Sequence, residues 1–219
     1  GWTLSAETMI GNGAFKLVKW EHDLRITMQK NTNYWNYESV KPDIINFELI
    51  DDVNTAMAGI LNEDIYFYKT TPPNDRERLI KEGIAKIVPN ISLYFYEVDH
   101  RKKPFNDARV RKAISLAIDR DYIVNTIMKA GEIPAAAIVP YDIKDADSNN
   151  DFRIKKREYF STKKEDYQKN VEEAKKLLAD AGYPNGENFP VFGFITNPGF
   201  HITVAESIQN MLKKHLNID

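Results

Sequence analysis

The spacing of apolar residues changes near residue 99, and this change limits the chain to a mixed α/β fold. Before that point apolar and polar side chains alternate in short runs, as in residues 24–30, which is typical of a half-buried strand. Beyond it apolar residues recur every three or four positions, as in residues 110–118, which is typical of an amphipathic helix. We therefore expect an α/β protein in two parts, residues 1–98 and 99–219.

Strand-like runs, capping residues and glycines predict the individual elements. In the first part we expect helices at 53–61 and 75–82 and strands at 14–20, 24–30, 44–50, 64–68, 85–88 and 92–98. In the second part we expect a polar surface excursion at 140–168 and a strand at 189–196. We also expect four helices. The first is capped by Asn106 or Asp107, the second covers 120–130, the third has an apolar face from Val171 to Ala181, and the last is lined by apolar residues from Val204 to Leu212. Residues 216–219 look like the start of another element, so we expect the chain to be truncated.

Charge and composition exclude several classes of protein and site. The 219 residues include 30 basic and 32 acidic side chains, and the formal net charge of -2 gives no electrostatic reason to expect a nucleic acid or an anionic membrane as partner. Residues 1–10 lack the pattern of a secretion signal, and no apolar run approaches the ~20 residues that span a bilayer. The absence of cysteine excludes disulfides, thiolate nucleophiles and zinc–cysteine sites.

Motifs for catalysis and cofactor binding are missing from the sequence. Residues 11–16, Gly-Asn-Gly-Ala-Phe-Lys, begin like a dinucleotide fingerprint, but the third glycine is absent and a hairpin is expected next. Asp119 and Asp121 could serve as paired carboxylates, although their place between two helices favours capping. Four histidines lie far apart and never at metal-ligand spacing, at His22, His100, His201 and His215. We expect no enzymatic activity, no cofactor and no metal site.

Two groups of aromatic residues suggest a binding surface. Tyr66, Phe67 and Tyr68 follow one expected strand, and Tyr94 to Tyr96 lie on another. Alternation along a strand lets part of each group face a core, but hardly all of it. Tyrosine combines a broad apolar face with a hydroxyl, which suits the binding of varied side chains. A half-buried aromatic sheet surface explains the same pattern equally well, so both interpretations stay open.

Four stretches carry a recognisable order of residues. They are Gly-Asn-Gly-Ala-Phe-Lys-Leu at 11–17, Lys-Asn-Thr-Asn-Tyr-Trp at 30–35, Lys-Pro-Phe-Asn-Asp-Ala-Arg-Val-Arg-Lys-Ala at 103–113 running into Ala-Ile-Asp-Arg at 117–120, and Ala-Lys-Lys-Leu-Leu-Ala-Asp-Ala-Gly-Tyr-Pro at 174–184. In this order and spacing they resemble extracellular solute-binding protein family 5, the oligopeptide-, dipeptide- and nickel-binding proteins of ABC importers. Tyr-Phe-Tyr-Glu at 94–97 looks closest to the oligopeptide-binding branch.

The resemblance implies a type II periplasmic-binding-protein-like architecture, here truncated, in which mixed sheets with flanking helices form two lobes that close over a ligand. The chain would cross between the lobes near Glu97 to Phe105 and would bind an extended peptide, largely through the peptide backbone, without chemistry. The residues that match the family's ligand cleft are Phe67, Tyr68, Lys69, Tyr94 and Tyr96. The family often has tyrosine where this chain has Phe67, which puts a hydroxyl contact there in doubt.

The same resemblance implies partners and a location. The protein would be a monomeric substrate-binding component that captures short peptides outside the membrane and delivers them to the permease subunits of an ABC transporter. It would be a cell-surface lipoprotein or a periplasmic protein, and its only membrane contact would be a lipid anchor outside this fragment, which lacks the N- and C-terminal parts of the family. A nickel chelate, haem or an oligosaccharide is an alternative ligand. A hydrolase is a remote alternative, because the sequence shows no nucleophile–base constellation.

Overall fold

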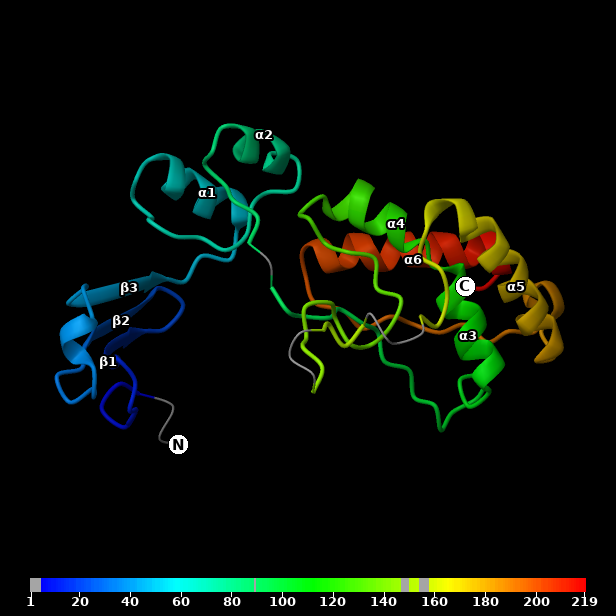
Figure 1. Cartoon of the computed structure of the whole chain (residues 1–219), viewed down its shortest axis with the longest axis horizontal. Coiled ribbons are helices and arrows are strands. Elements are labelled where there is room, and N and C mark those ends of the chain that lie inside the picture. Colours follow the sequence, from blue (N-terminus) through cyan, green and yellow to red (C-terminus); the bar gives the residue numbers. More distant parts are fainter. Residues whose placement is uncertain (1–4, 89, 147–149, 154–157) are drawn as a thin grey trace. The chain divides into compact units, whose positions relative to one another are not determined.

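A computed structural model of the chain describes residues 5–88, 90–146, 150–153 and 158–219. The backbone divides into two compact units, Gly1–Pro72 and Pro73–Asp219 (Figure 1). Residues 73–98, which the sequence groups with the first part, belong to the second compact unit. The predicted crossing between two lobes near residue 98 is a different boundary, and it stays a prediction. In the described ranges no helix is long and apolar enough to cross a membrane.

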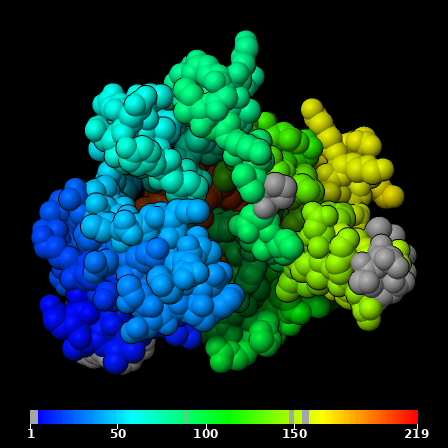
Figure 2. Space-filling view, turned by 60° about the vertical axis from the view of Figure 1, so that its left-hand side comes forward, coloured from blue at the N-terminus to red at the C-terminus, as the bar shows by residue number. Residues whose placement is uncertain are grey.

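The first unit contains a three-stranded antiparallel sheet with the strand order β1-β2-β3. β1 (Phe15–Glu21) pairs with β2 (Arg25–Lys30), which pairs in turn with β3 (Ile44–Glu48). The turn between β1 and β2 places Asp23 at φ 60°, a left-handed conformation that aspartate tolerates. The first three predicted strands are therefore confirmed, and Figure 2 draws this unit in blue to cyan.

Helix α1 (Val53–Leu61) begins at the predicted residue because Asp52 caps it. The Asp52 carboxylate accepts hydrogen bonds from the backbone N–H and the hydroxyl of Thr55, each at 2.8 Å. These bonds, that of the backbone first, lower the pKa of Asp52. One orphan donor of the first turn is thus satisfied, and Ala56 and Met57 are buried on the inner face of the helix. A short 3-10 turn, Tyr37–Ser39, lies between β2 and β3.

The predicted strands at 64–68 and 85–88 are wrong, because the residues that would begin them close a helix instead. Two successive amides after α1 donate to the carbonyl of Gly59, at 2.9 and 3.0 Å. Two successive amides after α2 (Arg76–Lys81) donate in the same way to the carbonyl of Leu79, at 2.9 and 3.0 Å. Carbonyls at the end of a helix need such partners. The backbone is therefore folded back on each helix and is not free to join a sheet.

The predicted strands at 92–98 and 189–196 are also wrong, for a different reason. Side chains alternate in burial along 191–196, with Phe192, Phe194 and Thr196 partly buried and the residues between them exposed. Within the described residues, however, the one backbone–backbone hydrogen bond made along 191–196 runs from the Phe192 N–H to the Asp219 carbonyl, at 3.4 Å. Alternation of buried and exposed side chains shows that one face of an extended segment packs on a core. A β-strand also requires a hydrogen-bonded neighbouring strand. Among the residues that the structure describes, neither stretch is paired with another strand.

The second unit is helical. Besides α2 it contains the helices and helical turns α3 (Ala108–Ala117), α4 (Arg120–Tyr122), η2 (Ile123–Met128), η3 (Lys164–Asp166), α5 (Tyr167–Asp180), η4 (Pro184–Gly186) and α6 (Phe200–Leu216). Its core consists of apolar residues from α3, α5 and α6 together with the last turn of the chain, namely Val110, Ala113, Leu116, Ala117, Ala174, Leu178, Val204, Ile208, Leu212, Leu216 and Ile218. The 3.6-residue periodicity of the sequence thus predicted these three helices correctly.

Helices α3 and α5 run antiparallel, as the contacts at their ends show. The guanidinium of Arg109, at the start of α3, donates to the carbonyl of Asp180 at the end of α5, at 2.5 Å. At the opposite ends, the Tyr167 hydroxyl donates to the carbonyl of Ala117, at 2.9 Å. Both acceptors are carbonyls of a last helical turn, which have no partner inside their own helix. Each helix therefore completes the hydrogen bonding of the other.

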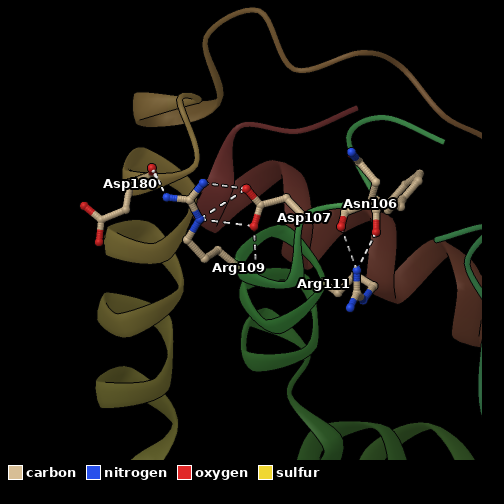
Figure 3. A network of polar contacts seen from close by, with 6 residues as sticks. Asn106, Asp107, Arg109, Arg111 and Asp180 are labelled. Atoms are coloured by element: carbon tan, nitrogen blue, oxygen red, sulfur yellow. Dashed lines mark hydrogen bonds and ion pairs between the residues drawn. The ribbon is translucent and has the colours of Figure 1, made fainter. Parts of the chain in front are cut away.

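The residues Asn-Asp-Ala-Arg-Val-Arg at 106–111 hold the start of α3 (Figure 3). Asp107 accepts from the Arg109 N–H at 2.8 Å as a helix cap and pairs with the Arg109 guanidinium at 2.6 Å. That guanidinium is the main cause of the lowered pKa of Asp107. Arg111 donates to the carbonyls of the two residues before Asp107, at 2.8 and 3.2 Å. This part of the motif that carries the family resemblance therefore stabilises the first turn of α3. We call the contacts of Asp107, Arg109 and Arg111 the clasp.

We expect Asp107→Ala to lower the melting temperature by about 3 °C or more, because it removes a helix cap and the partner of Arg109. Thermal unfolding followed by circular dichroism measures the effect. Asp75→Ala is a matched control, since Asp75 occupies the N-cap position of α2 but makes no side-chain cap hydrogen bond. Equal melting temperatures for the two variants would show that the clasp does not stabilise α3.

The predicted helix at 120–130 is shorter and partly of another type. Asp119 caps α4 by accepting from the Tyr122 N–H at 2.9 Å, as expected. From Ile123 the turns widen into the π-helix η2, which ends at Met128 because Lys129 adopts a left-handed conformation with φ 50°. The helix therefore stops two residues before Ala130, the predicted last helical residue. In the predicted excursion at 140–168, the residues that the structure describes before Lys164 form no helix, and α5 already begins at Tyr167.

Candidate functional site

The residues predicted to bind a ligand fall into two groups, one in each compact unit. Phe67, Tyr68 and Lys69 follow α1 in the first unit, and Tyr94 and Tyr96 lie in the second. The assignment of these two groups to one ligand cleft stays a prediction.

The first group lies on an exposed turn. Phe67 is 82% exposed and its neighbour Tyr66 is 96% exposed, whereas Tyr68 is half-buried. Ile65, just before them, packs on α1 so closely that a Cβ atom at Gly59 would lie 2.7 Å from its Cδ1 atom. Ile65 therefore anchors the turn and leaves the following aromatic rings in solvent. Aromatic side chains held in that way are available for contact with a ligand or another part of the protein.

The second group forms a connected aromatic cluster that includes a residue from α6. The Tyr94 hydroxyl lies 3.0 Å from Nδ1 of His201, and the two rings stack with centroids 5.2 Å apart. The hydroxyls of Tyr94 and Tyr96 are hydrogen bonded at 3.4 Å, and their rings meet edge to face. Tyr96 in turn packs edge to face on Phe194, at 5.2 Å. We call Tyr94, Tyr96 and His201 the tyrosine–histidine cluster.

His201 was not predicted as a site residue, because the four histidines lie far apart in the sequence and never at metal-ligand spacing. It lies in the first turn of α6, after Gly199, which adopts φ 78°. More than a hundred positions separate it from Tyr94. No spacing rule connects residues so far apart. The available signal for His201 was its position in the first turn of the helix that follows the predicted strand at 189–196.

The chemistry of this cluster suits binding more than proton transfer. The pKa of Tyr96 is raised to about 12, first by burial and then by the Tyr94 hydroxyl, while the Thr196 hydroxyl opposes the shift. The phenol therefore stays neutral at physiological pH and offers a hydroxyl and an aromatic face. Tyr94 is 52% exposed, so one ring of the cluster is accessible to a ligand. The described part of the chain contains no group of three or more His, Asp or Glu residues that could hold a metal ion.

A pocket of about 260 Å³ lies beside this cluster, between residues 192–196 and α6. Its apolar lining includes Phe194, which contacts Tyr96, and Leu212 of the core. Glu206, Gln209 and Asp219 add polar groups to the wall. An apolar hollow with a few polar groups is the usual composition of a site that receives an apolar side chain.

Comparison with known proteins places these features in a family context. The whole chain, residues 1–219, matches the family model for bacterial extracellular solute-binding proteins, family 5 Middle. The periplasmic oligopeptide-binding protein OppA of Salmonella typhimurium is 32% identical over 224 residues, which cover 100% of this chain and 39% of that protein. The chain therefore spans well under half the length of this relative.

Solved structures show the same fold. OppA of Haemophilus influenzae in complex with the peptide RPPGFSPFR superimposes with a TM-score of 0.81 at 26% identity, covering 98% of this chain and 41% of that one. The murein tripeptide-binding protein MppA of Escherichia coli also gives 0.81 at 26% identity, covering 100% and 41%. A structure of MppA in its unliganded open form gives 0.57 at 25% identity, with the same coverage.

Proposed function

Because the chain belongs to the bacterial extracellular solute-binding proteins of family 5, with a type II periplasmic-binding-protein-like fold, we propose that it forms part of the substrate-binding component of an ABC importer. In this proposal the complete protein captures oligopeptides outside the membrane, at the cell surface or in the periplasm, and delivers them to the permease. It binds without catalysing a reaction. The observation that carries the proposal is the match over the whole chain to peptide-binding proteins such as OppA of Salmonella typhimurium.

The geometry of the second unit supports peptide capture. The tyrosine–histidine cluster offers hydroxyl, imidazole and aromatic groups on one accessible surface. Such groups can accommodate peptide side chains of different sizes because aromatic faces are tolerant and hydroxyls both donate and accept. We propose that Tyr94 and Tyr96 contribute to the peptide site together with His201, and that Phe67, Tyr68 and Lys69 contribute from the first unit.

We expect the full-length protein to bind peptides in calorimetric titrations with pools of defined length, and Tyr94→Ala to weaken that binding about tenfold. Loss of Tyr94 removes a ring that stacks on His201 and a hydroxyl that contacts both partners. Tyr159→Ala is the control, because Tyr159 is 74% exposed and lies outside the cluster.

Three results would redirect the proposal. If no peptide pool gives heat while a nickel chelate, haem or an oligosaccharide does, the ligand class is wrong although the family holds. Turnover of a peptide or sugar would revive a hydrolase. Equal weakening by Tyr94→Ala and Tyr159→Ala would remove the tyrosine–histidine cluster from the peptide site.

A further inference from the structure

Residues 73–88 are joined to the helical core of the second unit by a connection with little internal structure. Along residues 91–98 no backbone–backbone hydrogen bond is formed with any described residue. A segment without ladder or helix bonds opens at low free energy and does not fix the orientation of what it connects. The position of α2 and the residues after it must therefore depend on side-chain contacts.

The first such contact is made by Arg76, the first residue of α2. Arg76 is only 8% exposed, and its Nη1 donates to the backbone carbonyl of Met128. Met128 is the last residue of the π-helix η2, and Lys129 after it is left-handed. The last carbonyls of a helix lack partners inside it, and π-helical turns occur preferentially at functional sites. The guanidinium thus binds a carbonyl that the end of η2 leaves available.

The second contact is made to Gly131, three residues after Met128 in the sequence. The side chain of Ile87 packs against Gly131, where an added Cβ atom would lie 3.0 Å from Cγ2 and 3.2 Å from Cδ1 of Ile87. The Ile87 side chain therefore contacts the backbone of Gly131 directly, because glycine has no side chain to come between them. One polar contact, from Arg76 to Met128 at the end of η2, and one apolar contact, from Ile87 to Gly131 just after it, join the two ends of residues 73–88 to this part of the chain.

Two structures of MppA superimpose on this chain to different extents over the same residues. The same protein, MppA, gives TM-scores of 0.81 and 0.57 in two structures, each covering 100% of this chain. Because sequence and coverage are alike, the difference lies in how parts of the matched region are placed relative to one another.

We propose that Arg76 and Ile87 form a latch that holds residues 73–88 against the end of η2, and that this latch opens as a conformational step of the protein. The latch joins residues on both sides of the predicted lobe crossing at residue 98. Its opening would release one predicted lobe from the other, and its closure would add a charged hydrogen bond to the closed arrangement. This inference goes beyond peptide capture and does not depend on which ligand is bound.

Spin labels on two introduced cysteines can measure the latch directly, because these 219 residues contain no cysteine and any cysteine elsewhere in the full-length protein can be replaced by serine. Lys81→Cys at the end of α2 and Lys169→Cys on α5 are exposed positions. Double electron–electron resonance on the full-length protein without peptide then reports the distances between the two labels. We expect Arg76→Ala to raise the ratio of the longer-distance to the shorter-distance population about tenfold, the effect of losing a hydrogen bond to a charged group.

Arg78→Ala is the matched control, because Arg78 lies on the same helix but pairs with Asp75 and Glu82 of its own segment. We expect it to leave the distance distribution unchanged. An Arg76→Ala protein that melts normally and keeps the wild-type distribution would overturn the latch. If Arg76→Ala does not fold, Ile87→Ala decides in its place by the same criterion. Since no peptide is present, a negative result leaves the proposed peptide capture untouched.

Discussion

Gly186→Ala is expected to destabilise the protein by about 2–5 kcal/mol, because two independent costs add at this position. Gly186 has φ 75°, a left-handed conformation that costs a residue with a Cβ atom about 1–2 kcal/mol. A Cβ atom there would also lie 2.4 Å from the carbonyl oxygen of Leu216 and 2.6 Å from that of Asn217. Both neighbours are backbone atoms at the end of α6, so they cannot rotate away and the last turn of α6 must shift.

Urea unfolding measures this loss, and Gly182→Ala separates its two causes. Gly182 has φ 97°, but no atom lies within 4 Å of a Cβ added there. Gly182→Ala should therefore show the conformational cost alone, about 1–2 kcal/mol. If both variants lose the same amount, the close approach of η4 and α6 does not contribute to the effect at Gly186.

Leu178→Ala is expected to lower the free energy of unfolding by about 2–5 kcal/mol. Leu178 of α5 is 2% exposed and belongs to the core formed with α3 and α6. Removing its isobutyl group loses the transfer free energy of the buried atoms and leaves a cavity that three packed helices can close only in part. Unfolding in urea, monitored by circular dichroism, gives the difference from the unaltered protein.

Ile195→Ala tests whether burial is the cause. Ile195 is 99% exposed, so the same kind of truncation removes almost no buried area, and we expect a change within about 0.5 kcal/mol. A loss at Ile195 that approaches the loss at Leu178 would mean that Ile195 packs against another part of the protein in solution.

Local signals in the sequence predicted the helices well. Asp52 and Asp107 each precede an apolar-periodic run, and both cap the helix that follows. A cap and a 3.6-residue period both act within one or two turns, so one segment of sequence contains all the information that they need. The three strands of the first unit were also found from local signals, such as the alternation of apolar and polar residues along 24–30 and the short turn between β1 and β2.

Features that depend on distant residues were not predictable in this way. The stretches 92–98 and 189–196 have the residue types of strands, but neither pairs with another strand among the residues that the structure describes, and the sequence of a stretch does not say whether a neighbour is present. The π-helical form of η2 was missed because the periodicities of α- and π-helices cannot be told apart over so few residues.

In the candidate site, too, residue types could be predicted from the sequence, whereas contacts between distant residues could not. Tyr94 and Tyr96 could be named because tyrosine is a binding residue by its chemistry, and the family resemblance pointed to the same positions. Their contact with His201 joins segments that only the tertiary fold brings together. Phe67, Tyr68 and Lys69 were named by the resemblance, and their role stays a prediction.

The stretch 191–196 also has a consequence for the behaviour of the chain at high concentration. Apart from the Phe192 N–H, its backbone groups bond to no other described backbone group, and together with the exposed side chains of Val191 and Ile195 they form a template for edge-to-edge aggregation. Pro190 and Pro198 stand on either side of this stretch, and proline has no N–H to offer to an added strand. The two prolines therefore act as gatekeepers that confine intermolecular strand pairing to the few residues between them.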